Sequence, residues 1–141
     1  VKGNFAKLGA LVAKGVPLPL AMVRNQRSFV AIDNLVDLII TCINHSKAAN
    51  QIFLASDGQD LSTPELLNGI AKAMGRDIKL FSLPSPLLSL GAAMIGKKDE
   101  ANSLLGSLQL DISKTRAVLG WSPVIDVEEG LRRCFDTNRQ S

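Results

Sequence analysis

The strongest constraint on the fold is a run of apolar residues at helical spacing, in Leu35-Val-Asp-Leu-Ile-Ile-Thr-Cys-Ile43. A stripe this broad predicts a helix that is buried over much of its surface. Asp33 stands just before the stripe as a candidate N-cap. The segment before it, Ser28-Phe-Val-Ala-Ile32, is rich in β-branched and aromatic residues and predicts a short strand. A strand that leads directly into a buried helix indicates a layered α/β fold.

Similar signals recur along the chain. Ser62-Thr-Pro-Glu65 has the pattern of a capping box, which predicts a helix that Gly75 ends. Further helices are predicted over residues 4–14, 87–94, from 111 or 113 to 120, and 126–138, and further strands over 51–55 and 77–82. Because the strands are short and few, we expect an α/β fold with a small mixed sheet and packed helices. Such a sheet needs the surface of another domain to complete it.

Composition indicates one globular domain spanning residues 1–141, with 46% hydrophobic residues. The 16 basic and 13 acidic side chains give a net charge of only +3, and aromatic residues are few, so we expect no nucleic-acid partner. No apolar run reaches the roughly 18–20 residues of a membrane span. The chain begins at Val1 without a signal-peptide pattern, which we interpret as a fragment or processed piece located in the cytoplasm.

Several kinds of chemistry are excluded by missing residue types. The chain has no tyrosine and a single histidine, His45, which excludes a Tyr-Lys catalytic pair and multi-histidine sites. The glycine-rich patterns that bind dinucleotides or nucleotide phosphates are absent. His45 is interpreted as a cation at a helix end, and Cys42 and Cys134 as buried small apolar residues. We therefore expect no catalytic, cofactor-binding or metal-ligating residue in this chain.

Two arginines form the main candidate for binding chemistry. Arg24 and Arg27 directly precede the strand predicted at 28–32. A guanidinium is planar, permanently charged and able to make two parallel hydrogen bonds, which suits it to clamp a phosphate. The alternative is a solvated basic surface.

The stretch Leu119-Gly-Trp-Ser-Pro123 is interpreted as structural, because each of its residues suits the end of a helix. It predicts a helix end against which the tryptophan packs.

Four motifs occur together in this order: Gly3-Asn4-Phe5, Pro17-Leu-Pro-Leu20, Arg27-Ser-Phe-Val-Ala-Ile-Asp-Asn-Leu35, and Asp111-Ile-Ser-Lys114 followed by Leu119-Gly-Trp-Ser-Pro123. In this order and spacing the chain resembles the C-terminal part of the extended short-chain dehydrogenases/reductases, and among them the NAD-dependent nucleotide-sugar epimerases and dehydratases. In that family an N-terminal Rossmann domain binds NAD and supplies the catalytic residues. The resemblance implies that this chain is the C-terminal, substrate-binding domain without its Rossmann domain.

The resemblance also implies which residues bind the substrate, a UDP-sugar. Asn4 is expected to contact the diphosphate. Leu18, Pro19 and Leu20 are expected to line the uracil with backbone groups. Arg27 is expected to clamp the diphosphate, which agrees with the phosphate-binding role inferred above from its guanidinium.

One departure from the family pattern concerns a second arginine. Family members usually carry one shortly before a Gly-Ser-Leu stretch, whereas this chain has Ser103 at that position, in Ser103-Leu-Leu-Gly-Ser-Leu108. Loss of one charge-assisted hydrogen bond, worth roughly 1.5–3 kcal/mol, weakens nucleotide binding. Lys97 or Lys98 offers a replacement charge.

For the parent protein the resemblance implies an NAD-dependent UDP-sugar 4-epimerase that works as a homodimer. This chain alone is expected to be catalytically inactive and to bind no NAD, its partners being the UDP-sugar and its missing Rossmann domain. One alternative is a 4-reductase or dehydratase of UDP-sugars in surface-polysaccharide synthesis. Another, of a different class, is a non-enzymatic interaction module that has lost ligand binding.

Overall fold

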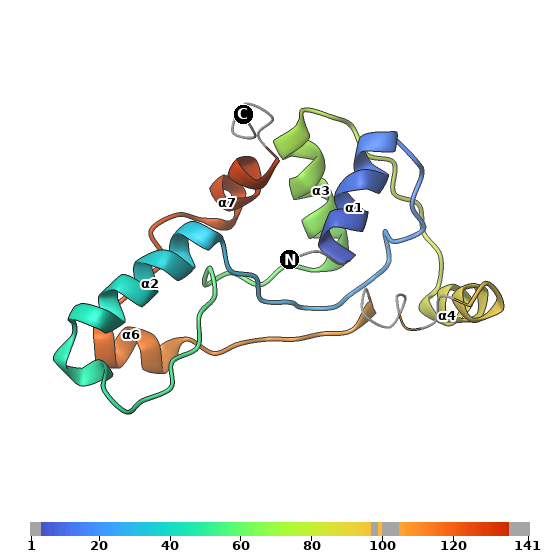
Figure 1. The fold of residues 1–141 in the computed structure, drawn as a ribbon. Coiled ribbons are helices and arrows are strands. Elements are labelled where there is room, and N and C mark those ends of the chain that lie inside the picture. The colour runs from blue at the N-terminus through green and yellow to red at the C-terminus, as the bar shows by residue number, and fades with distance from the viewer. Residues whose placement is uncertain (1–3, 97–98, 100–104, 136–141) are drawn as a thin grey trace.

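A computed structural model describes residues 4–96, 99 and 105–135. The helical elements in this part of the chain are α1 (Asn4–Lys14), α2 (Ile32–Asn44), the 3-10 turn η1 (Ser46–Ala48), α3 (Thr63–Met74), α4 (Ser85–Met94), α6 (Ser113–Leu119) and α7 (Val127–Cys134). In Figure 1, α1, α3 and α7 gather in the upper middle, α2 and α6 lie together at the left, and α4 stands apart at the right. Long extended segments connect these groups.

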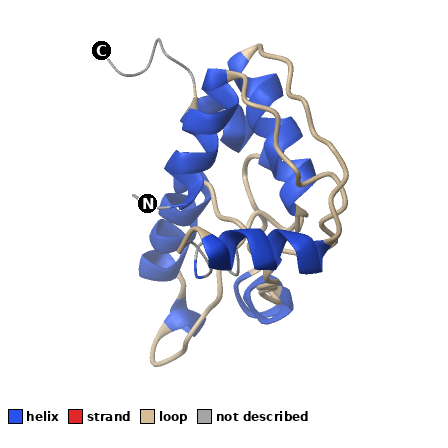
Figure 2. Ribbon diagram, turned by 90° about the vertical axis from the view of Figure 1, so that its right-hand side faces the viewer, coloured by secondary structure: helices blue, strands red, loops and turns tan. Residues whose placement is uncertain are grey.

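The small mixed sheet predicted from the sequence is not confirmed. Figure 2 shows only helices and loops in the described residues, where extended segments pair through three isolated bridges: Leu18 with Leu80, Arg27 with Leu61, and Arg27 with Leu108. In the first of these, the N–H and C=O of Leu18 both point to residues 79–81, and Pro17 and Pro19, which have no N–H, leave the opposite edge of the segment without donors at their positions. Residues 51–55 are extended but form no bridge. Within the described ranges the fold is therefore helix-rich.

A first core joins α1, α3 and α7. Its fully buried members include Val12 of α1 and Leu67 and Ile70 of α3, with Leu131 of α7 packed against them. Gly69 allows the close approach of α3 and α7, since a Cβ at this position would lie 2.6 Å from Leu131 Cδ1. This core sets the position of every element that contacts α3.

The predicted ends of α3 are confirmed. Ser62 Oγ accepts a hydrogen bond from the Glu65 amide at 3.3 Å, and the Ser62 amide donates to Glu65 Oε2 at 3.1 Å. Gly75 ends the helix with a φ of 66°, in the left-handed region that glycine adopts without strain. The capping box and the glycine therefore delimit the helix as the sequence indicates.

A second core joins α2, α6 and the extended segment at 53–55. Leu38, Ile112, Leu119 and Trp121 are its buried members. The predicted helix end at Gly120 is confirmed, with a φ of 63°. Trp121 then folds back as expected, and its indole N–H donates to Asp37 Oδ2 at 2.8 Å. The tryptophan thus links the end of α6 to α2 through both packing and a hydrogen bond.

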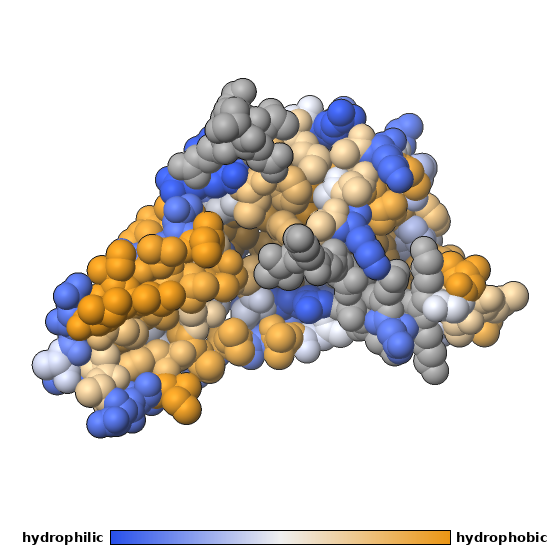
Figure 3. All heavy atoms as spheres, viewed as in Figure 1, coloured by the Kyte–Doolittle hydropathy of each residue, from blue (hydrophilic) through white to orange (hydrophobic). Residues whose placement is uncertain are grey.

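The opposite side of α2 is exposed. Five aliphatic side chains there keep 46–76% of their surface accessible: Ile32, Val36, Ile39, Ile40 and Ile43. Figure 3 shows an apolar patch over this helix. The apolar residues of this helix therefore form two faces. One face is buried around Leu38, and the other is exposed.

Asn34 ties α2 to two distant segments. Its side chain is fully buried and its amide nitrogen donates to Asp57 Oδ1 at 2.7 Å and to the Ile125 carbonyl at 2.9 Å. Its amide oxygen accepts from the Val124 and Ile125 amides at 2.8 and 3.0 Å. The four bonds use both donors of the amide group and saturate its acceptor. They hold the turn at Asp57 and the approach to α7 against the first turn of α2.

Some predicted caps differ from the structure. The N-cap of α2 is Ala31, whose carbonyl accepts from the Leu35 amide at 3.0 Å, so the prediction of Asp33 as N-cap is wrong. Asp33 lies instead in the first turn, where a carboxylate still favours the helix dipole, and it pairs with Arg133 at 3.1 Å. The helix begins earlier because this pairing and the Asn34 bonds order that turn. Ile112, without a side-chain bond, is the N-cap of α6, although Asp111 Oδ1 accepts from the Ser113 amide nearby.

The last helix, α7, is capped by Asp126, which accepts from the Glu129 amide at 2.8 Å. The Glu129 carboxylate bonds Arg132 and Arg133. Cys134 lies on the same face as Val127 and Leu131 but is exposed at the end of α7, so the prediction of its burial is wrong. Residues 136–138 of the predicted helix lie outside the described residues.

The role of Asn34 can be tested with Asn34→Ala. The substitution leaves the Val124 and Ile125 amides without their acceptor, and a buried group without a partner costs about 1–3 kcal/mol. We expect a loss of roughly 2–4 kcal/mol in the free energy of unfolding, measured by urea denaturation. The control is Asn44→Ala on the same helix, whose exposed side chain makes one bond, to the Ile40 carbonyl. Equal losses in the two variants would contradict this role.

The carboxylate at Glu129 predicts a pH dependence. Its hydrogen bonds with Arg132 and Arg133 lower the pKa of Glu129 from 4.5 to about 2. The folded state therefore holds this proton less tightly than the unfolded state, and the resulting stability is present above pH 4.5 and lost as the pH falls to about 2. We expect Glu129→Gln to make unfolding less sensitive to pH across this window, as measured by urea midpoints. Glu128→Gln is the control, since its bond to Lys72 joins side chains that are 70% and 71% exposed.

Candidate functional site

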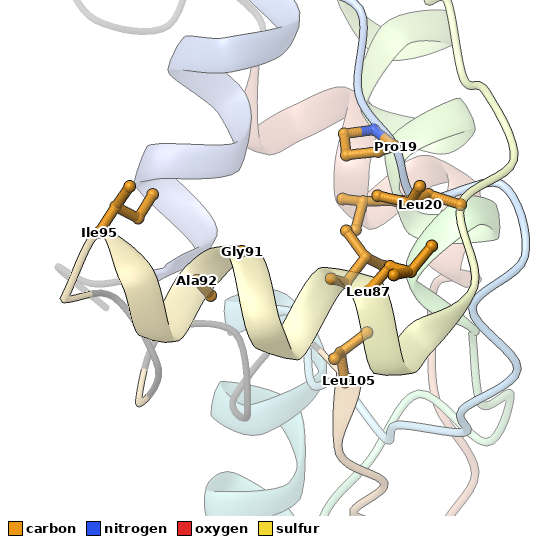
Figure 4. A pocket seen from close by; sticks show the side chains of 9 residues that line it. Pro19, Leu20, Leu87, Gly91, Ala92, Ile95 and Leu105 are labelled. Atoms are coloured by element: carbon orange, nitrogen blue, oxygen red, sulfur yellow. The ribbon is translucent and has the colours of Figure 1, made fainter.

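An apolar pocket lies between α4 and the segment at Pro19 and Leu20. It has a volume of about 380 Å³ and is lined by Pro19, Leu20, Leu83, Leu87, Leu88, Gly91, Ala92, Ile95 and Leu105. Figure 4 shows Pro19 and Leu20 beside Leu87, with Ile95 at the other end of α4. All nine lining residues are uncharged, so the pocket suits a flat or apolar group and provides no side-chain charge of its own.

The pocket exists because prolines hold both of its walls. Pro17 and Pro19 keep the first wall extended, and Leu18 pairs there with the 79–81 segment: its amide donates to the Lys79 carbonyl at 2.9 Å and its carbonyl accepts from the Phe81 amide at 3.0 Å. Pro84 then precedes α4, and Pro86 occupies its first turn, a favoured position for proline. The pairing at Leu18 therefore sets where α4 begins relative to Pro19 and Leu20.

The three residues expected to line a uracil have different positions. Pro19 and Leu20 are part of the pocket wall. Leu18 is buried in the first core, and its backbone N–H and C=O are both used in the pairing with residues 79–81. A uracil that contacted the backbone of Leu18 would therefore have to compete with the hydrogen bonds to residues 79–81.

Arg27 lies where three extended segments meet. Its amide donates to the Leu61 carbonyl at 2.9 Å and its carbonyl accepts from the Leu61 amide at 2.9 Å. On its other side the chain runs parallel to residues 106–110, with the Ser28 amide donating to the Leu108 carbonyl at 2.8 Å. The guanidinium belongs to a half-buried residue, whereas Arg24 is exposed. The structure thus brings together Arg27 and the Gly-Ser-Leu stretch, which are far apart in the sequence.

Two side chains, those of Asn25 and Ser28, keep this alignment in register through hydrogen bonds. The Asn25 amide group donates to the Gly106 carbonyl at 2.9 Å, while its oxygen accepts from the Thr63 amide at 2.8 Å. Ser28 Oγ donates to Asp60 Oδ1 at 2.5 Å and accepts from the Leu110 amide at 2.8 Å. The residues on either side of Arg27 are therefore fixed, which limits where its side chain can reach.

Other expected positions are only partly visible. Asn4 begins α1, but its side chain lies outside what the structure describes. Ser103, Lys97 and Lys98 also lie outside the described residues. His45, interpreted as a cation at a helix end, is the C-cap of α2, and its Nδ1 accepts from the Lys47 amide at 3.1 Å. The histidine thus caps the following 3-10 turn.

Sequence reasoning missed the α4 wall of the pocket. Leu87, Leu88, Gly91 and Ala92 line it, although nothing in the sequence marked them as binding residues. The signal that could have found them is an uncharged stretch, since no acidic or basic residue occurs from Leu80 to Gly96.

Among the described residues, no group of three or more histidine, cysteine, aspartate or glutamate side chains is arranged to hold a metal ion. In the same ranges, no helix is long and apolar enough to cross a membrane.

Comparison with known proteins shows what this chain is similar to. The chain is 48% identical over 136 residues to the UDP-glucose 4-epimerase of Vibrio cholerae, an alignment that covers 94% of this chain and 41% of the epimerase. The chain resembles part of a nucleotide-sugar epimerase. It is also 28% identical over 129 residues to the uncharacterized protein y4nL of Sinorhizobium fredii, covering 80% of this chain and 36% of that protein. No family model matches the chain.

Solved structures share the fold. Pal from Bacillus thuringiensis matches with a TM-score of 0.59 at 18% identity, over 96% of this chain and 39% of Pal. RMD from Pseudomonas aeruginosa, solved in complex with NADPH, matches with a TM-score of 0.58 at 12% identity, over 94% of this chain and 39% of RMD. The resemblance indicated by the four motifs is therefore confirmed. The chain spans about two fifths of the length of the epimerase.

The open space beside Gly91 can be tested by filling it. A Cβ at Gly91 meets no atom within 4 Å, and glycine inside a helix is less favourable than leucine by about 0.5–1 kcal/mol. We expect Gly91→Leu to raise the free energy of unfolding by about that amount, measured by urea denaturation. Gly69→Ala should lack this gain, because its Cβ would lie 2.6 Å from Leu131 Cδ1 and the Leu131 side chain would have to shift within the first core. A destabilised Gly91→Leu protein would show that the pocket is closed.

Proposed function

We propose that this chain is the UDP-sugar-binding portion of an NAD-dependent UDP-sugar 4-epimerase. The observation that carries the proposal is the 48% identity to UDP-glucose 4-epimerase along 94% of the chain. An apolar pocket beside Pro19 and Leu20, two of the residues expected to line the uracil, supports the proposal. Epimerisation is favoured over the reductase and dehydratase alternatives because the relative is an epimerase.

In this proposal the pocket binds the uracil. The ring lies against Pro19 and Leu20 on one side and the α4 residues Leu87 and Gly91 on the other, which supply apolar contact. The diphosphate extends toward Arg27, whose guanidinium binds phosphate oxygens with paired hydrogen bonds. Asn4 is proposed to contact the same diphosphate. Substrate binding and orientation are thus the contribution of this chain.

The described residues do not fit a dinucleotide cofactor. The pocket is lined by uncharged side chains, and the sequence has no glycine-rich turn to receive a pyrophosphate. We propose that NAD and the catalytic residues belong to the portion of the parent protein outside this chain. The isolated chain is therefore expected to bind a UDP-sugar weakly and to have no epimerase activity.

The test is a titration of the purified chain with UDP, followed by NMR shifts and by calorimetry. Arg27→Ala should weaken the affinity by about 10- to 100-fold, because a hydrogen bond to a charged group is worth roughly 1.5–3 kcal/mol. Arg24→Ala is the matched control, since it removes the same charge from an exposed residue nearby. Gly91→Leu should also weaken binding, by filling the pocket proposed for the base.

Three results would overturn the proposal. One is an affinity for UDP that is the same in the Arg27→Ala variant as in the unmodified chain. Another is the absence of any localised shift around Arg27 and Leu20, which would favour the interaction module. The third is turnover of UDP-glucose by the chain alone, which would disprove the expected inactivity.

A further inference from the structure

The three segments that meet at Arg27 have two different faces. Arg27 lies directly opposite Leu61 in an antiparallel bridge and beside Leu108 in a parallel one. Residues paired in this way project their side chains to one side of the backbone, and the next residue on each segment projects to the other side. On that other side the register places three polar residues in a row across the segments: Ser28, Asp60 and Gln109.

Hydrogen bonds run along this polar row. Ser28 Oγ donates to Asp60 Oδ1 at 2.5 Å, and Gln109 Nε2 donates to Asp60 Oδ2 at 3.0 Å. The segments of Asp60 and Gln109 are the outer two of the three, because each pairs with the segment that carries Arg27. The bond between Asp60 and Gln109 therefore joins the outer segments directly, across the small side chain of Ser28. Asp60 is the member of the row that bonds both of the other segments.

The row does the work that a sheet ladder would do. Each outer segment is joined to Arg27 by one isolated bridge. One bridge fixes a point of contact, whereas the direction in which a segment runs from that point depends on further bonds. On one side of Arg27 these bonds come from Asn25, which holds Gly106 and Thr63. On the other side they come from Asp60 and its two partners.

We propose that Asp60 is a positioning residue for diphosphate binding. Through Ser28 and Gln109 it holds the backbone around Arg27 in the orientation from which the guanidinium can make paired hydrogen bonds to phosphate oxygens. The inference rests on the proposed function, which supplies the ligand of Arg27. Asp60 acts from behind the site, since a carboxylate that faced a diphosphate would repel it. Both of its oxygens bond the row instead.

The experiment compares the affinities of the purified chain for UDP and for uridine, both measured by NMR titration. Uridine has no phosphate, so its binding does not depend on the orientation of Arg27. Asp60→Ala should weaken UDP binding about 3- to 10-fold, the equivalent of one ordinary hydrogen bond, and leave uridine binding unchanged. Asp111→Ala is the matched control, because it removes a nearby carboxylate that bonds Ser113 in its own turn. It should change neither affinity.

Two further variants separate positioning from a merely structural role. The double variant Arg27→Ala, Asp60→Ala should bind UDP no more weakly than Arg27→Ala alone, because Asp60 acts through the arginine. Asp60→Asn should keep the affinity for UDP. Its oxygen still accepts from Ser28, and Gln109 can turn its amide group to accept from the new amide nitrogen. If Asp60→Ala does not fold, Gln109→Ala, a change at an exposed residue, takes its place in the comparison.

Three results would overturn the positioning role. One is an equal weakening of UDP and uridine binding in Asp60→Ala, which indicates a general loss of structure. Another is an unchanged affinity for UDP in that variant when Arg27→Ala weakens it. The third is additive losses in the double variant, since Asp60 would then act independently of the arginine. A result in which Arg27→Ala itself leaves UDP binding unchanged is different, because it disproves the proposed function and the positioning role with it.

Discussion

The fold depends on the buried amide of Asn34. In a β-sheet, backbone ladders would join distant segments, but the described part of this chain contains only isolated bridges. In this chain the side chain of Asn34 joins distant segments instead. Its hydrogen bonds hold Asp57 and the backbone of residues 124–125 against the start of α2. Asn25 plays the same role elsewhere, joining the first turn of α3 to Gly106. Buried and fully satisfied amide groups specify one arrangement, because any other leaves polar groups unpaired.

The two cores differ in how completely they are closed. The core of α1, α3 and α7 surrounds Leu67 and Ile70, which have no exposed surface. In the core of α2 and α6, Leu38 and Trp121 are buried, whereas the opposite face of α2 is uncovered. The pocket adjoins the closed core, since Leu20 belongs to both. The pocket proposed for the ligand thus adjoins the core that is closed, whereas the exposed face of α2 belongs to the core that is open.

Helix positions were largely predictable because their signals are local. The capping box at Ser62, the left-handed glycines at 75 and 120 and the extended Pro17–Leu20 segment each act within a few residues. Strand pairing was not predictable in this way, because an extended segment forms a strand only when a second segment lies beside it. Residues 51–55 have the alternation of a strand and lack that neighbour among the described residues. The α4 wall was missed for a related reason, since Leu87 and Gly91 line a pocket only once Leu18 has paired with Leu80.

The sequence by itself determined where the helices begin and end, to within a residue or two, and which family the motifs resemble. It also identified Arg27 and, through the family resemblance, Asn4 and the Leu18–Leu20 segment as candidates for binding. Only the tertiary structure decided that Pro19 and Leu20 face a pocket while Leu18 is buried, and that Arg27 lies against the Gly106–Leu108 stretch. Caps and turns depend on interactions between near neighbours, which a sequence pattern records directly. Pockets and segment pairings depend on contacts between residues far apart in the chain, which only the folded arrangement brings together.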